Sequence, residues 1–194
     1  KEIASPGSIE FEDYIEEAKK AVKAFEDKGV NKIIALTHLG YDDSVAFDND
    51  QMLAKSVPGI DIVVGGHTHT ELKAPVVVDT NTVGEKKDAT LIVQAYQYAD
   101  FLGTLDVSFD ENGVVVKHKG QLIKVADFAE DAETLKLLAP FKEKVDVVAN
   151  TEIGVKLTAE LVNPRDNESI GAPSVRNSET ALGNIITDGM LAKA

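Results

Sequence analysis

IDIVVGGHTH, residues 60–69, joins a short apolar run to a glycine turn that carries two histidines. Such a run is typical of a buried β-strand, and glycine allows the backbone to turn sharply and to approach a bound group closely. A second apolar run, residues 32–37, ends in His38-Leu39-Gly40 in the same way. Three of the four histidines therefore follow the carboxyl ends of predicted strands, where open α/β sheets bind their ligands.

These histidines, His38, His67 and His69, are candidate metal ligands. One alone would more simply be a turn residue, but neutral imidazole is the commonest metal ligand, and three together favour a metal site. Imidazole binds zinc, manganese, iron or cobalt, and the residue type does not choose among them. A short helix predicted near Asp50–Ser56 separates the two strands, which gives a βαβ unit with parallel neighbours. Both histidine loops are therefore expected at one edge of one sheet.

The sequence also predicts a helix before the two histidine loops and several strands after them. Ser8 is expected to cap a helix whose apolar positions recur at three and four residues. After Thr70 the pattern predicts mostly antiparallel strands packed on the βαβ layer, in the segments 76–78, 90–95, 102–109 and 114–125. The sequence Asp110-Glu111-Asn112-Gly113 is typical of a hairpin turn between the last two of these strands.

Two helices are predicted further along. The first begins at Asp131 and is kinked or divided by Pro140, with an apolar face expected to be buried that comprises Leu135, Leu138 and Val145. The second begins at Ser178 and carries on one face Leu182, Ile185, Ile186 and Met190. That face needs a cover, so we expect the chain to be a piece of a longer protein. A second copy of the chain, in a non-native dimer, is the alternative cover.

Composition limits the classes of function. With 194 residues and a net charge of −13, the chain lacks the basic surface that nucleic-acid binding requires. No stretch approaches the roughly 18 consecutive apolar residues of a membrane span, and no targeting peptide is visible. The absence of cysteine excludes disulfides and thiolate ligands. An acidic surface repels a phosphate-bearing molecule unless the local charge is inverted, which bound divalent cations usually do.

Several other polar and aromatic residues are predicted to have no role in the metal site. The acids after His38 could offer carboxylate ligands but are interpreted as solvated loop residues: Asp42, Asp43, Asp48 and Asp50. Asp61 begins its strand at the end opposite His67, and His118 is expected at a solvated strand position. Three aromatic residues are expected in strand and core packing rather than in a base clamp: Tyr96, Tyr98 and Phe101.

Three segments resemble motifs of the 5′-nucleotidase family of calcineurin-like metallophosphoesterases. LTHLG at 36–40 resembles one ligand loop of that family, and GGHTHT at 65–70 resembles another. RNSETALGNIITDGM at 176–190 resembles the segment that leads from the metal domain into the C-terminal substrate domain. The resemblance implies an α/β fold, part of a four-layer α/β/β/α sandwich, in which a βαβ unit is followed by mostly antiparallel strands.

The resemblance also implies roles for the histidines. Of two divalent metal ions, His38 and His67 would ligate one and His69 the other. The family's remaining ligands and its catalytic Asn-His pair belong to motifs that do not occur in these 194 residues. No catalytic residue is therefore predicted here, and the substrate-binding residues are unknown. Residues 1–150 would be the C-terminal part of the metal domain, 151–177 an irregular connection, and 178–194 a helix leading into a missing C-terminal nucleotidase domain.

The predicted function is that of a fragment of a two-metal phosphohydrolase that removes phosphate from nucleotides or other phosphomonoesters, the isolated chain being inactive. Within the family the alternative is a 2′,3′-cyclic-nucleotide phosphodiesterase/3′-nucleotidase or a UDP-sugar hydrolase. An alternative of another class is a non-catalytic metal-binding or interaction module. The resemblance implies an extracellular, cell-surface or periplasmic location.

Overall fold

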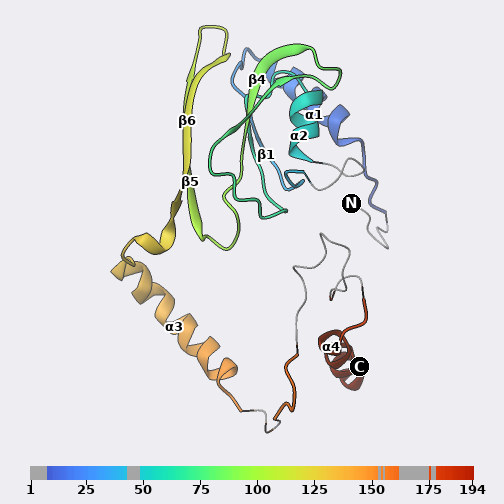
Figure 1. Cartoon of the computed structure of the whole chain (residues 1–194), viewed down its shortest axis with the longest axis vertical. Helices are drawn as coiled ribbons and strands as arrows, with labels where there is room; N and C mark the ends of the chain where they lie inside the picture. Colours follow the sequence, from blue (N-terminus) through green and yellow to red (C-terminus); the bar gives the residue numbers. More distant parts are fainter. Residues whose placement is uncertain (1–7, 43–48, 153, 155, 162–174, 176–177) are drawn as a thin grey trace. The chain divides into compact units, whose positions relative to one another are not determined.

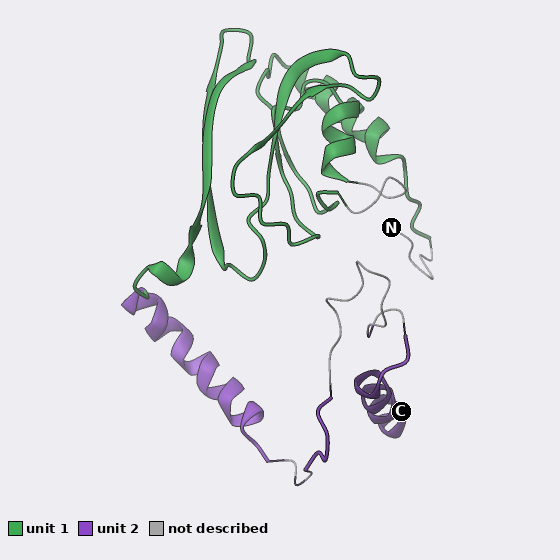
Figure 2. Cartoon of the chain, viewed as in Figure 1, with its two compact units in different colours: residues 1–130 green, residues 131–194 purple. Residues whose placement is uncertain are grey.

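The computed structural model describes residues 8–42, 49–152, 154, 156–161, 175 and 178–194. It divides into two compact units, residues 1–130 and residues 131–194, which are coloured separately in Figure 2. The finer division of the chain at 150 and 177 stays a prediction.

A four-stranded mixed sheet forms the centre of the first unit (Figure 1). Its order is β1 (Ile34–Leu36), β2 (Ile62–Val64), β4 (Lys86–Val93) and β3 (Val76–Thr80). The strands β1, β2 and β4 run parallel, and β3 pairs antiparallel with β4. Helix α2 (Asp50–Ser56) connects β1 to β2, which confirms the predicted βαβ unit.

Helices and a hairpin cover the two faces of this sheet. Helix α1 (Tyr14–Glu26) and α2 lie on one side, and the hairpin of β5 (Phe101–Phe109) and β6 (Val115–Lys124) lies on the other (Figure 1). The core between helices and sheet consists of apolar side chains: Val22, Ile33, Leu53, Ala54, Val57, Ile60, Val63, Val78 and Ile92. Layers of helix, sheet and sheet confirm the predicted α/β class, and the hairpin turn at 110–113 lies at the predicted position.

The placement of β3 and β4 differs from the prediction. The sequence pattern predicts both in a separate antiparallel layer, but they extend the βαβ sheet, with β4 hydrogen-bonded beside β2. The antiparallel pairings β3–β4 and β5–β6 are as predicted. The alternation of apolar residues indicates that a segment is a strand but does not specify which strand it joins, and here the free side of β2 accepts β4.

The start of α1 also differs from the prediction. The helix begins at Tyr14, and its N-cap is Asp13 rather than Ser8. The Asp13 carboxylate accepts a hydrogen bond of 2.9 Å from the Glu16 N–H, which satisfies one of the unpaired donors of the first turn. Phe11, expected on the apolar face of the helix, lies before it and is 65% exposed.

The second unit contains α3 (Ala132–Ala149) and α4 (Ala181–Lys193). Pro140 lies inside α3 and does not divide it. The expected burial of one face of α3 is wrong: Leu135, Leu138 and Val145 are 44%, 53% and 63% exposed. None of the described residues of this unit is buried, so the unit has no core of its own. Within the described part of the chain, no helix has both the length and the apolarity that a membrane crossing needs.

Leu91→Ala tests the packing of β4. Leu91 is fully buried, so its truncation is expected to lower the free energy of unfolding by about 2–5 kcal/mol in urea denaturation. Leu36→Ala is the matched control, because Leu36 is 81% exposed and its truncation is expected to change stability by at most about 0.5 kcal/mol. Equal effects of the two substitutions would contradict this packing.

Candidate metal centre

Parallel strands bring both histidine loops to the same edge of the sheet. Leu36 is in register with Val64, and Val64 with Val93. The pairing continues one residue further, because the Thr37 N–H donates to the Val64 carbonyl at 3.0 Å and the Gly65 N–H donates to the Val93 carbonyl at 2.8 Å. The residues that follow β1 and β2 therefore leave the sheet side by side.

His38 and His67 face each other across this edge. Their ring centroids are 5.1 Å apart and the rings are nearly perpendicular, at 75°. A Cβ atom at Gly66 would lie 3.1 Å from His38 Nδ1, so glycine at this position permits the close approach of the two loops. His67 has a φ of 76°, a left-handed conformation that is uncommon for a residue with a side chain.

His69 lies against a different partner. Its ring is 5.8 Å from that of Tyr98 and tilted by 55°, and its φ of 53° is also left-handed. Tyr98 is 77% exposed, so the expected core packing of this residue is wrong, whereas Tyr96 does pack edge-on against Phe101 at 6.1 Å. In the described ranges, no group of three or more His, Cys, Asp or Glu side chains is arranged to hold a metal ion.

The spacing of the two imidazoles is nevertheless of the size that one shared cation would require. Two ring nitrogens, each about 2.1 Å from a tetrahedral ion, place the ring centroids roughly 5 Å apart. The observed separation of His38 and His67 matches that requirement. Two cations held close together need carboxylate donors as well, and the described residues bring none into this pair.

Asp50 is a buried carboxylate beneath the two loops, so the expectation of a solvated loop acid is wrong. It is fully buried, and its Oδ1 accepts a hydrogen bond of 2.6 Å from Thr37 Oγ1. Its Oδ2 has no hydrogen-bond partner among the described residues, and a Cβ atom at Gly65 would overlap it. Burial raises the pKa of Asp50, and the bond from Thr37 offsets part of that increase.

The other predicted acids and His118 have simpler positions. Asp42 is exposed as expected, while Asp43 and Asp48 lie outside the described residues. Asp61 Oδ2 accepts a hydrogen bond of 2.7 Å from the Ile33 N–H at the opposite end of the strands, which is a structural role. His118 is exposed on β6, as predicted.

Sequence reasoning missed one further residue at this edge. Gln94 directly follows β4 and is only 3% exposed, and its side chain binds the turn that carries His67 and His69. A polar residue directly after an apolar strand is the same signal that identified His38 and His67. The signal becomes usable only once β4 is known to run parallel to β2.

Asp50→Asn is expected to weaken the pH dependence of stability. Because burial raises the Asp50 pKa above its ordinary 3.8, the folded protein holds this proton more tightly than the unfolded chain does. The contribution of Asp50 to the free energy of unfolding therefore falls as the pH rises from 3.8 through the raised pKa, and this contribution is level above that pH. Asparagine still accepts from Thr37 but does not ionise, so urea denaturation at stepped pH should give a shallower slope.

The control for this experiment is Asp42→Asn, which removes an exposed carboxylate that lies between β1 and α2. Its pH profile should follow that of the wild type. Burial also raises the pKa of Asp61, so some slope remains in the Asp50 variant. Identical slopes for Asp50→Asn and wild type would contradict the prediction.

The comparisons with known proteins agree with this fold. No family model matches the chain. The trifunctional nucleotide phosphoesterase protein YfkN of Bacillus subtilis is 42% identical over 196 residues, which cover 98% of this chain and 12% of that protein. The 5′-nucleotidase of Homo sapiens is 31% identical over 204 residues, which cover 97% of this chain and 32% of that protein.

A solved structure is similar over the same length. The crystal structure of the 5′-nucleotidase precursor from Thermus thermophilus matches with a TM-score of 0.71 and 35% identity, covering 99% of this chain and 37% of that one. The chain thus spans between 12% and 37% of the length of these relatives. Because sequence and fold agree along nearly its whole length, the chain corresponds to a segment of the proteins of the 5′-nucleotidase family.

Proposed function

We propose that this chain carries part of the metal centre of a phosphohydrolase that removes phosphate from nucleotides. The observation that carries the proposal is the pair His38 and His67, which face each other at 5.1 Å at the ends of parallel strands. The nucleotidase names of the relatives support nucleotides as the substrate class.

In this proposal His38 and His67 hold one divalent cation, of zinc, manganese, iron or cobalt, and His69 contributes to a second. Bound cations of this kind activate water and stabilise charge on phosphoryl oxygens. The chain's own residues orient the donors: Gly66 permits the approach of the two imidazoles, and Thr37, beside His38, is fixed by its bond to Asp50. The net charge of −13 repels a phosphate ester, and local positive charge from bound cations would offset that repulsion.

The name of one relative supports a broader substrate class. YfkN, 42% identical to this chain, is called a trifunctional nucleotide phosphoesterase. A 2′,3′-cyclic-nucleotide phosphodiesterase/3′-nucleotidase is therefore the second candidate, with the same histidine edge. A UDP-sugar hydrolase would use this edge in the same way, and a non-catalytic metal-binding module would need only the bound cation.

The proposed location is extracellular, cell-surface or periplasmic. A snake venom 5′-nucleotidase of Crotalus adamanteus, 32% identical over 200 residues, supports export. That match covers 97% of this chain and 32% of the relative. For the chain in isolation, a dimer in which a second copy covers the apolar face of α4 is still a proposal.

Cobalt binding tests the proposed metal ligands. The wild-type chain is expected to bind Co²⁺ with the visible absorption of an imidazole complex, and His38→Ala or His67→Ala should weaken binding by at least about tenfold. His118→Ala is the control, because His118 is exposed on β6 and its loss should leave the titration unchanged. Equal titrations for the wild type and both ligand variants would contradict the proposal.

Hydrolysis of AMP by the isolated 194 residues is expected to be no faster than in a blank that contains the metal alone. The three histidines supply no bridging carboxylate and no transition-state donor, and each of these is worth powers of ten in rate. Phosphate release with Mn²⁺ or Co²⁺ present is the measurement. Turnover that disappears in His67→Ala would show that the chain contains a complete centre after all.

A further inference from the structure

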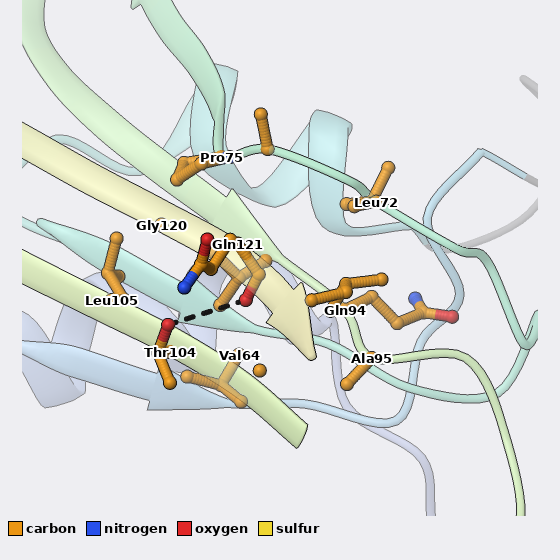
Figure 3. A pocket seen from close by; sticks show the side chains of 13 residues that line it. Val64, Leu72, Pro75, Gln94, Ala95, Thr104, Leu105, Gly120 and Gln121 are labelled. Carbon is orange, nitrogen blue, oxygen red and sulfur yellow. Dashed lines mark hydrogen bonds between the residues drawn. The ribbon is translucent and has the colours of Figure 1, made fainter. Parts of the chain in front are cut away.

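Gln94 lies where β4 leaves the sheet, directly beneath the turn 66–70. It is 3% exposed, which is unusual for a glutamine. Its stem lines an apolar pocket of about 220 Å³ between the two sheets. Figure 3 shows its amide group pointing away from Thr104 and Gln121, on the other sheet of the pocket. The polar end of Gln94 is therefore directed at the turn and not into the pocket.

The amide of Gln94 binds the turn on both sides of His67 and His69. Its Nε2 donates to the Gly66 carbonyl at 3.2 Å. Its Oε1 accepts from the Thr70 N–H and from Thr68 Oγ1, the latter at 3.3 Å. Thr68 Oγ1 lies 2.8 Å from the Thr70 hydroxyl, which closes the network. One side chain thus binds the residues that precede, separate and follow the two histidines.

Glutamine has the donor and acceptor set for these bonds at this length without depending on protonation. The Gly66 carbonyl can only accept and the Thr70 N–H can only donate, so the orientation of the amide is fixed by its partners. Glutamate would accept from Thr70 but would oppose the Gly66 carbonyl when ionised. Methionine would fill the volume and satisfy neither group.

The turn needs such support, because its backbone is strained. Both His67 and His69 have left-handed φ values, 76° and 53°, which are unfavourable for residues with a Cβ. Conformations of this kind persist only when their surroundings fix them from several sides. Among the described contacts, the Gln94 network supplies bonds at Gly66, Thr68 and Thr70.

We propose that Gln94 is a positioning residue that holds the turn 66–70 in the conformation that presents His67 and His69, and thereby sets the affinity of this edge for a divalent cation. The statement on the turn stands on the hydrogen bonds alone. The statement on cation affinity rests on the proposed function.

The test compares the wild-type chain with Gln94→Met, Gln94→Glu and the control Gln121→Met. Gln121 lines the same pocket from β6 but has no side-chain bond to the turn among the described residues. The first readout is the hydrogen-exchange protection of the Thr70 amide in the metal-free protein, measured by NMR relative to that of Leu91. The second is the Co²⁺ dissociation constant from the visible absorption.

Gln94→Met is expected to lower the protection of the Thr70 amide at least about tenfold relative to Leu91, because its acceptor is gone. It should weaken Co²⁺ binding by about 10–100-fold, as removal of an outer-shell partner does in other metal sites. Gln121→Met should change neither quantity. Gln94→Glu should protect Thr70 well at about pH 5, where a protonated carboxyl donates to Gly66, and poorly at about pH 8, where the ionised form repels it.

The outcomes separate the two statements. Unchanged protection of Thr70 in Gln94→Met, and in Gln94→Glu at about pH 8, would overturn the positioning role. A variant that is less stable overall but keeps the wild-type ratio of Thr70 to Leu91 protection and the wild-type Co²⁺ affinity would overturn it too. If the wild type binds no Co²⁺, the proposed function and the affinity statement fail, while Thr70 protection still decides whether Gln94 holds the turn.

Discussion

The parallel register of β1, β2 and β4 is the constraint on which the histidine edge depends. A slip of one residue between parallel strands would reverse every side chain between the two faces of the sheet. Ala35, Val63 and Ile92 are in register and pack against the helices, so the apolar core fixes the alignment. The polar residues that follow the strands inherit that alignment, and this is why side chains far apart in the sequence meet at one edge.

Two features of the residues at this edge lower the stability of the folded chain. Asp50 buries a carboxylate of which one oxygen has no hydrogen-bond partner among the described residues, and two histidines have left-handed backbones. Each of these features costs free energy that a purely structural turn would avoid. The core beneath, in which Val57, Val63 and Ile92 are fully buried, offsets the loss. Strain and buried charge gathered at one edge of an otherwise regular sheet are typical of a functional site.

Much of the fold could be predicted because its signals are local. The apolar runs, the helix Asp50–Ser56 and the hairpin turn at 110–113 all depend on residues close in sequence, and they are confirmed. The partner of β4 and the burial of Asp50 depend on residues distant in sequence, for which a single pattern has no signal. The prediction that one face of α3 is buried was wrong for another reason. An apolar periodicity indicates that a face needs cover, but it does not say what covers that face.

Neutral donors define what this edge contributes to a metal centre. Imidazoles leave the full charge of a bound cation available to attract and polarise a phosphate ester, whereas each carboxylate ligand would cancel part of it. Two cations held by neutral ligands alone would repel each other strongly at the separation that a two-metal phosphohydrolase requires. In the proposed centre His38 and His67 would supply neutral donors, and anionic donors are needed to hold its two cations together. Asp50 does not take that place, because its carboxylate is bound to Thr37 and packed against Gly65 beneath the loops. Asp50 therefore supports the residues that would bind the metal, and it is not one of them.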